Sequence, residues 1–228
     1  MDGEIMKVQL PALLSLNAGY VDTAGFLALQ GLFTAHVTGN FVTFGASMVL
    51  GTSGAVAKLL ALPMFCAIVV FTRVLSTLLD RWKLPSLRTL LVLKLLLLTL
   101  GAVLAIRLGP FADGDAWAAI ATGMVLVSAM AIQNAVHRIH LGSAPPTTLM
   151  TGTTTQIMID VADLMLGAPP EAKAAARARL RRMSLSVVCF AAGCLLAALL
   201  YGTVQVWCFI FPAILAALAV WPWQAVET

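Results

Sequence analysis

The residues of this chain best suited to chemistry are polar side chains placed inside long apolar runs. Asp22 lies about twelve residues into the first apolar segment, where a carboxylate costs about 2.5 to 3.5 kcal/mol on membrane-insertion scales. A residue this unfavourable needs a compensating role. Asp22 could bind a proton or a cation. Structurally, it could instead pair with Arg73 or Lys94, the two basic residues within apolar segments.

Two short Thr-Gly motifs form a second group of candidates. They occupy corresponding places in the two halves of the chain: Ala35, His36, Val37, Thr38, Gly39 and Asn40 in the first, and Thr148, Leu149, Met150, Thr151, Gly152 and Thr153 in the second. Thr38 and Thr151 suit helix N-cap positions, and the glycines would let a solute approach the backbone. Two helix N-termini meeting inside a membrane would favour an anion or the electronegative end of a neutral solute. The alternative is that the Thr-Gly pairs only permit tight helix packing.

Amide and imidazole side chains complete the candidate set. Asn17, Gln133 and Asn134 lie at depths similar to that of Asp22 and could bind a solute or tie helices together. His36 could gate the site or relay protons. The other histidines are expected on the opposite side of the membrane, so we expect no metal site. Asp160 and Asp163 come late in their segment and are weaker candidates.

The composition indicates the class of protein to which these residues belong. Of 228 residues, 61% are hydrophobic and 11% are charged, whereas charged residues make up about a quarter of a soluble domain. We therefore expect an all-α integral membrane protein. The net charge of +4 is explained by loop topology, so no nucleic-acid partner is expected. The four cysteines lie in apolar runs, and enzyme motifs are absent from the sequence. We thus expect neither a disulfide framework, nor a cofactor, nor an enzyme.

Eight apolar segments can be traced along the chain: 10–29, 37–50, 55–79, 89–107, 116–137, 148–166, 183–201 and 205–222. The segments 37–50 and 148–166 differ from the others because they are short or rich in Thr and are bounded by Gly or Pro. A helix of about 14 residues reaches only about 21 Å, against about 30 Å for a hydrocarbon core.

The distribution of basic residues indicates whether these two segments cross the membrane. If all eight segments cross, the basic loop residues divide eight against four; if the two short segments re-enter on one side, they divide ten against two. The positive-inside rule therefore favours six transmembrane helices, two re-entrant half-helices and both termini in the cytoplasm. The run 171–182 is expected to form a basic helix on the inner leaflet, or simply to determine topology.

The same arrangement implies an inverted repeat. Each half would contain three crossings and one re-entrant segment, so the second half must be inverted relative to the first. The chain is then a single membrane domain, 1–228, with repeats at about 8–108 and 115–223. Inverted 3+3 repeats are common in secondary transporters.

Four motifs carry a resemblance to a known family: NAGYVDTAGFL (17–27), HVTGN (36–40), QNA (133–135) and MTGT (150–153). Together they resemble the YoaK-like family of bacterial inner-membrane proteins, a domain of unknown function. Val37 stands where the family would have Met. The resemblance implies a multi-pass protein of the bacterial inner membrane and brings no assigned site residue with it.

The residues themselves favour a small secondary transporter for a small polar or anionic solute. The solute would bind near the midplane at the two Thr-Gly turns, with Asp22 as the coupling site. A passive channel and a membrane scaffold or regulator are the alternatives. Beyond the solute and the lipid bilayer, a homodimer is the one further partner we consider.

Overall fold

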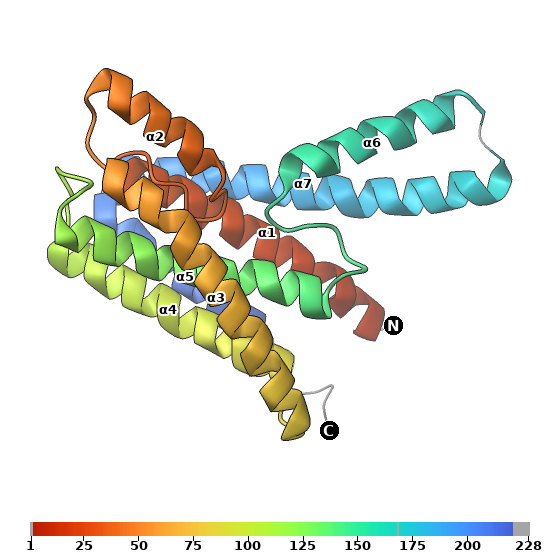
Figure 1. Ribbon diagram of the computed structural model, residues 1–228. Coiled ribbons are helices and arrows are strands. Elements are labelled where there is room, and N and C mark those ends of the chain that lie inside the picture. Colours follow the sequence, from red (N-terminus) through yellow and green to blue (C-terminus); the bar gives the residue numbers. More distant parts are fainter. Residues whose placement is uncertain (1, 168, 221–228) are drawn as a thin grey trace.

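Helices account for nearly all of the computed structural model, which describes residues 2–167 and 169–220 (Figure 1). The elements, in chain order, are α1 (Asp2–Ala28), α2 (Gly39–Leu50), α3 (Ala55–Arg81), α4 (Ser86–Leu108), α5 (Trp117–His140), α6 (Met150–Met165), α7 (Pro170–Val204), the 3-10 helix η1 (Gln205–Phe209) and α8 (Ile210–Val220). No strand occurs within these ranges, so the all-α prediction is confirmed. The ends of the predicted segment 205–222 and of the second repeat at 223 lie outside the described residues.

Several helices are apolar enough to cross a bilayer. By length and composition the candidate spans are Ala55–Arg81, Ser86–Leu108, Trp117–His140 and Pro170–Val220, the last of which contains both α7 and α8. The helix α2 is apolar but only 12 residues long. The basic run 171–182 continues without a break into the next apolar segment, so the two form the single 35-residue helix α7. These features indicate a helical membrane protein.

The backbones of α1 and α7 touch at two glycines. An ideal Cβ at Gly193 would lie 2.1 Å from the Leu16 carbonyl oxygen, and one at Gly19 would lie 2.1 Å from the Phe190 carbonyl oxygen. Neither position leaves room for a side chain. Small residues at a crossing let two apolar helices approach closely, which increases van der Waals contact between them.

The remaining helix pairs complete the bundle. α3 packs on α5, α4 packs on both α5 and α8, and α1 packs on α8 as well as on α7. α2 packs against α3, and α6 packs against α7. In Figure 1, α2 and α6 lie on the same side of the bundle and diverge from neighbouring starts.

At one end of the bundle, the last turn of α1 meets the turn before α3. An ideal Cβ at Gly54 would lie 3.3 Å from the Gln30 carbonyl oxygen. The α4–α5 loop covers both segments: Gln30 Nε2 donates to the Phe111 carbonyl at 3.0 Å, and Asp115 accepts hydrogen bonds from the Gly54 and Val56 N–H groups at 3.0 and 2.8 Å. The chain therefore leaves this end at Gln30 and returns to it at Gly54, after α2.

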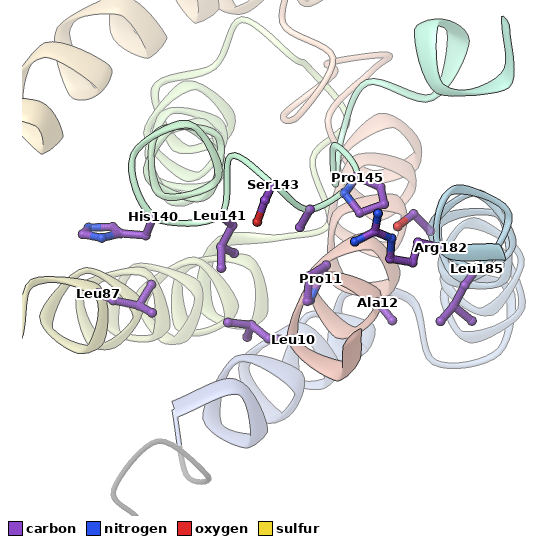
Figure 2. A pocket seen from close by; sticks show the side chains of 12 residues that line it. Leu10, Pro11, Ala12, Leu87, His140, Leu141, Ser143, Pro145, Arg182 and Leu185 are labelled. Atoms are coloured by element: carbon purple, nitrogen blue, oxygen red, sulfur yellow. The ribbon is translucent and has the colours of Figure 1, made fainter. Parts of the chain in front are cut away.

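A similar return occurs at the opposite end. Figure 2 shows a cavity of about 320 Å³ between the start of α1, the start of α4, the end of α5 and the middle of α7. Leu141 follows α5 directly, and Arg182 belongs to α7; both line this cavity. The chain therefore leaves this end near Leu141 and passes it again near Arg182, with α6 and the first part of α7 in between.

The contact at Gly193 generates a test of the bundle. We expect Gly193→Ala to lower the free energy of unfolding by about 1–3 kcal/mol, because the added methyl group would overlap the α1 backbone. Thermal unfolding in detergent would measure it. Gly202→Ala is the matched control on α7, since nothing lies within 4 Å of a Cβ there, and it should cause no loss. Equal melting temperatures for the two variants would contradict the close α1–α7 crossing.

Candidate functional site

Asp22 is the anchor of the first loop, residues 29–38. Its side chain is 4% exposed, and its Oδ1 accepts hydrogen bonds from the backbone N–H groups of Thr34, Ala35 and His36 at 2.8, 2.7 and 3.3 Å. Its Oδ2 lies 2.7 Å from His36 Nδ1. An ionised carboxylate only accepts hydrogen bonds, so Nδ1 of His36 is the donor in this pair.

The observed partners of Asp22 differ from those that the sequence suggested. Lys94 Nζ donates instead to Gln133 Oε1 at 2.5 Å, and Arg73 lines a cavity described below. The hypothesis that Asp22 pairs with Arg73 or Lys94 is therefore wrong. The carboxylate binds the loop instead, whose buried irregular backbone needs acceptors for its N–H groups.

Asn40 closes the same loop from the other side. Its Oδ1 accepts from the Phe33 N–H at 2.9 Å, and its Nδ2 donates to the Phe33 carbonyl at 2.8 Å. Both ends of the amide are thus occupied by backbone. The turn that opens the loop is made by Gln30 and Gly31, which have φ values of 53° and 84°.

The second loop, residues 141–149, is held by two neighbouring amides on α5. Thr148 Oγ1 donates to Asn134 Oδ1 at 2.7 Å, and Gln133 Nε2 donates to Thr147 Oγ1 at 3.1 Å. Gln133 Nε2 also donates to the Leu14 carbonyl of α1 at 2.9 Å. Asp22 in the first half and this amide pair in the second therefore have the same task. One half uses a carboxylate with backbone N–H groups. The other uses amides with threonine hydroxyls, together with His137, whose Nε2 lies 3.1 Å from the Ala144 carbonyl oxygen.

The two Thr-Gly motifs differ in register. Thr38 is the N-cap residue of α2, without a side-chain cap hydrogen bond. The N-cap of α6 is Leu149, so Thr151, expected at the N-cap, is instead the second residue of the helix. Thr153 donates its hydroxyl to the Leu149 carbonyl at 2.8 Å, and a Cβ at Gly152 would meet nothing within 4 Å.

The starts of α2 and α6 face a common cavity of about 480 Å³, which we call the central cavity. It lies between the first loop, α3, the end of α5 and the start of α6, and it is lined by Ala35, His36, Val37, Thr38, Leu62, Phe65, Val69, Arg73, Asn134, Ala135, Arg138, Ile139 and Leu149. Within the described part of the chain, neither arginine has a carboxylate within 4.0 Å. No Asp or Glu belongs to this lining.

His36 also lines a second cavity, of about 290 Å³, on the other face of the first loop. This second cavity includes Asp22, Phe33 and the α7 residues Phe190 and Cys194. The ring of His36 meets that of Phe190 edge-on, with centroids 5.5 Å apart. The Asp22–His36 pair therefore lies between two cavities, where a titratable group can contact both.

The structure brings some of the candidate residues together and leaves others apart. The central cavity is lined by His36, Thr38 and Asn134. Asp22 does not line it but is hydrogen-bonded to His36. The others do not line it: Gly39, Asn40, Gln133, Thr151, Gly152, Thr153 and Asn17. Asn17 instead donates to the Pro212 carbonyl of α8 at 3.2 Å. Over the described residues, no group of three or more His, Cys, Asp or Glu could hold a metal ion.

Arg73 and Arg138 are the cavity residues that sequence reasoning missed as site candidates. Arg138 was counted as a topology marker and Arg73 as a possible partner of Asp22. No sequence spacing could have linked them, because they belong to α3 and α5. These two helices pack together only in the fold.

The loop contacts of Asp22 predict its effect on stability. Asp22→Ala should lower the free energy of unfolding by about 3 kcal/mol or more, because three buried N–H groups lose their acceptor at about 1–3 kcal/mol each. Asp22→Asn keeps one acceptor oxygen, so its free energy of unfolding should lie between those of the wild type and Asp22→Ala. The readout is thermal unfolding in detergent, with the exposed Asp163 changed to Ala as a control that should leave the melting temperature unaltered. A wild-type melting temperature for Asp22→Ala would rule out the anchoring role.

Comparisons with known proteins give a family and no assigned activity. Neither a curated protein nor a solved structure matches the chain. A protein-family model described as "Protein of unknown function (DUF1275)" matches residues 10–221, nearly the whole chain. This match agrees with the resemblance to the YoaK-like family, and the chain belongs to the DUF1275 family.

Proposed function

We propose that this protein is a small secondary transporter that carries a small polar or anionic solute across the bacterial inner membrane. The observation that carries the proposal is the central cavity, which is lined by Thr38 before α2, by Leu149 before α6 and by two arginines that have no carboxylate partner among the described residues. Helix N-termini carry partial positive charge. The cavity therefore combines four sources of positive potential and suits an electronegative solute.

In the proposed topology six segments cross the membrane: α1, α3, α4, α5, α7 and the C-terminal segment that η1 and α8 form together. The short helices α2 and α6 would enter and leave on one side. The return of the chain from Gln30 to Gly54 at one bundle end, and from Leu141 to Arg182 at the other, supports this arrangement. Both termini would lie in the cytoplasm, on the side rich in Lys and Arg.

The helix contacts support an inverted repeat in which α1 to α4 correspond to α5 to α8. Exchanging each helix with its counterpart turns the α1–α7 pair into α5–α3, and α4–α5 into α8–α1. It also turns α2–α3 into α6–α7 and leaves α4–α8 unchanged. All of these pairs are in contact, as expected when a pseudo-twofold axis relates the two halves.

The Asp22–His36 pair is the proposed coupling site. It separates the central cavity from the second cavity, so a proton taken up from one cavity could be released to the other once the first loop moves. A loop that divides two cavities suits alternating access better than an open channel. No chemical conversion of the solute is part of the proposal.

Currents from proteoliposomes would test this function. Solid-supported-membrane recordings with acetate, lactate, benzoate, glycine and inorganic phosphate should give a proton-coupled transient current for at least one of them. We expect His36→Gln to reduce that current at least tenfold, because glutamine can hydrogen-bond but cannot carry the proton. Asp163→Asn is the control and should keep the full current.

The alternatives give different results in the same recordings. A passive channel would conduct the solute equally well in the His36→Gln variant. A scaffold would give no current with any of the five solutes. Either result would overturn the proposed transporter.

A further inference from the structure

We infer that the central cavity binds a small organic anion, whose carboxylate is held by Arg73 and Arg138 and whose apolar body lies against α3 and α5. This inference rests on the proposed function and names the substrate class of the same site. It separates organic carboxylates from inorganic ions and from neutral polar solutes, all of which the proposed function admits.

The charge of the cavity selects for an anion. Arg73 and Arg138 are part of its lining, and no Asp or Glu is among the described residues that line it. A guanidinium presents a planar fork of donors that matches a carboxylate. Arg73 lies within the apolar segment 55–79, where an arginine is costly unless it is compensated, and an anion from solution would supply the compensation that no described carboxylate provides.

The walls select for an apolar body. Leu62, Phe65 and Val69 follow one another along one face of α3, and Ala135 and Ile139 do so on α5. Leu149 adds a further apolar side chain from the start of α6. An inorganic ion would leave this surface against water, whereas a hydrocarbon body would bury it at about 25 cal/mol per Å².

The volume agrees with a molecule of this kind. A cavity of about 480 Å³ falls in the range of about 300–1,000 Å³ that is typical of small-molecule sites. His36, Thr38 and Asn134 leave room for a few polar contacts beside the carboxylate. A lipid phosphate followed by its acyl chain shares the same chemistry, so the test must separate a free organic anion from a headgroup.

The experiment is calorimetric titration of the purified protein in phosphatidylcholine nanodiscs. The probes are benzoate, acetate, inorganic phosphate and the neutral benzamide. We expect benzoate to bind at least tenfold more tightly than each of the other three. Comparable affinity for phosphate, tight binding of benzamide, or no binding of benzoate at millimolar concentration would each overturn the inference.

Variants test the two arginines directly. Arg73→Gln and Arg138→Gln should each weaken benzoate binding at least tenfold while keeping a melting temperature close to that of the wild type. Arg81→Gln is the matched control, because Arg81 is exposed at the end of α3 and does not line the cavity. Unchanged benzoate affinity in both cavity variants would overturn the inference.

Two further experiments distinguish a free anion from a lipid headgroup, and this inference from the transport proposal. Replacing phosphatidylcholine by phosphatidylglycerol should leave the benzoate affinity unchanged; a loss would identify a lipid headgroup as the occupant and overturn the inference. Arginine-dependent benzoate binding without any current would support this inference and remove the transport proposal. Proton-coupled currents that persist in both arginine variants would support the transport proposal and overturn this inference.

Discussion

The carboxylate of Asp22 is the contact on which the rest of the site depends. A chain that turns back within an apolar medium leaves backbone N–H groups that no water can satisfy, and each costs several kcal/mol if it stays unpaired. Asp22 supplies the acceptor for three consecutive residues of the first loop. This fixes His36 beside it and places Thr38 at the start of α2. Without this contact neither the wall of the central cavity nor the partition between the two cavities would be defined.

The second half meets the same requirement with different groups, and this difference bears on the proposed coupling. Its loop is held by Gln133 and Asn134 and by His137, whose Nε2 lies 3.1 Å from the Ala144 carbonyl oxygen, whereas the first loop is held by a carboxylate next to an imidazole. If the two halves are related by inversion, the contacts of the described residues place a carboxylate next to an imidazole in the first loop alone. A coupled transporter needs such an asymmetry between otherwise similar halves, because the proton must change the stability of one loop more than that of the other.

The sequence was sufficient for the class of protein and for the importance of Asp22, because both follow from local hydropathy. A buried carboxylate in an apolar run is costly whatever its partner, so its need for compensation can be read without a structure. The partner itself could not be identified, because His36 belongs to an irregular loop that the sequence alone does not place beside Asp22. The N-cap of α6 was misplaced by two residues, since Thr-Gly pairs fit both the cap and the first turn. Arg73 and Arg138 were read as topology markers or ion-pair partners because charge counts carry no information about which helices pack together.

The proposed topology depends most on α2 and α6 turning back within the membrane. Labelling of single cysteines with a membrane-impermeant maleimide in intact bacterial cells tests this directly, after the four native cysteines have been replaced. The positions are Leu84 in the α3–α4 turn, Ala112 in the α4–α5 loop and Ala174 near the start of α7, all exposed. The account predicts that only the cysteine at Ala112 is labelled from outside, and that those at Leu84 and Ala174 react only after permeabilisation. Labelling of Leu84 from outside, with Ala112 and Ala174 both protected, would mean that both short helices cross the bilayer and would contradict it.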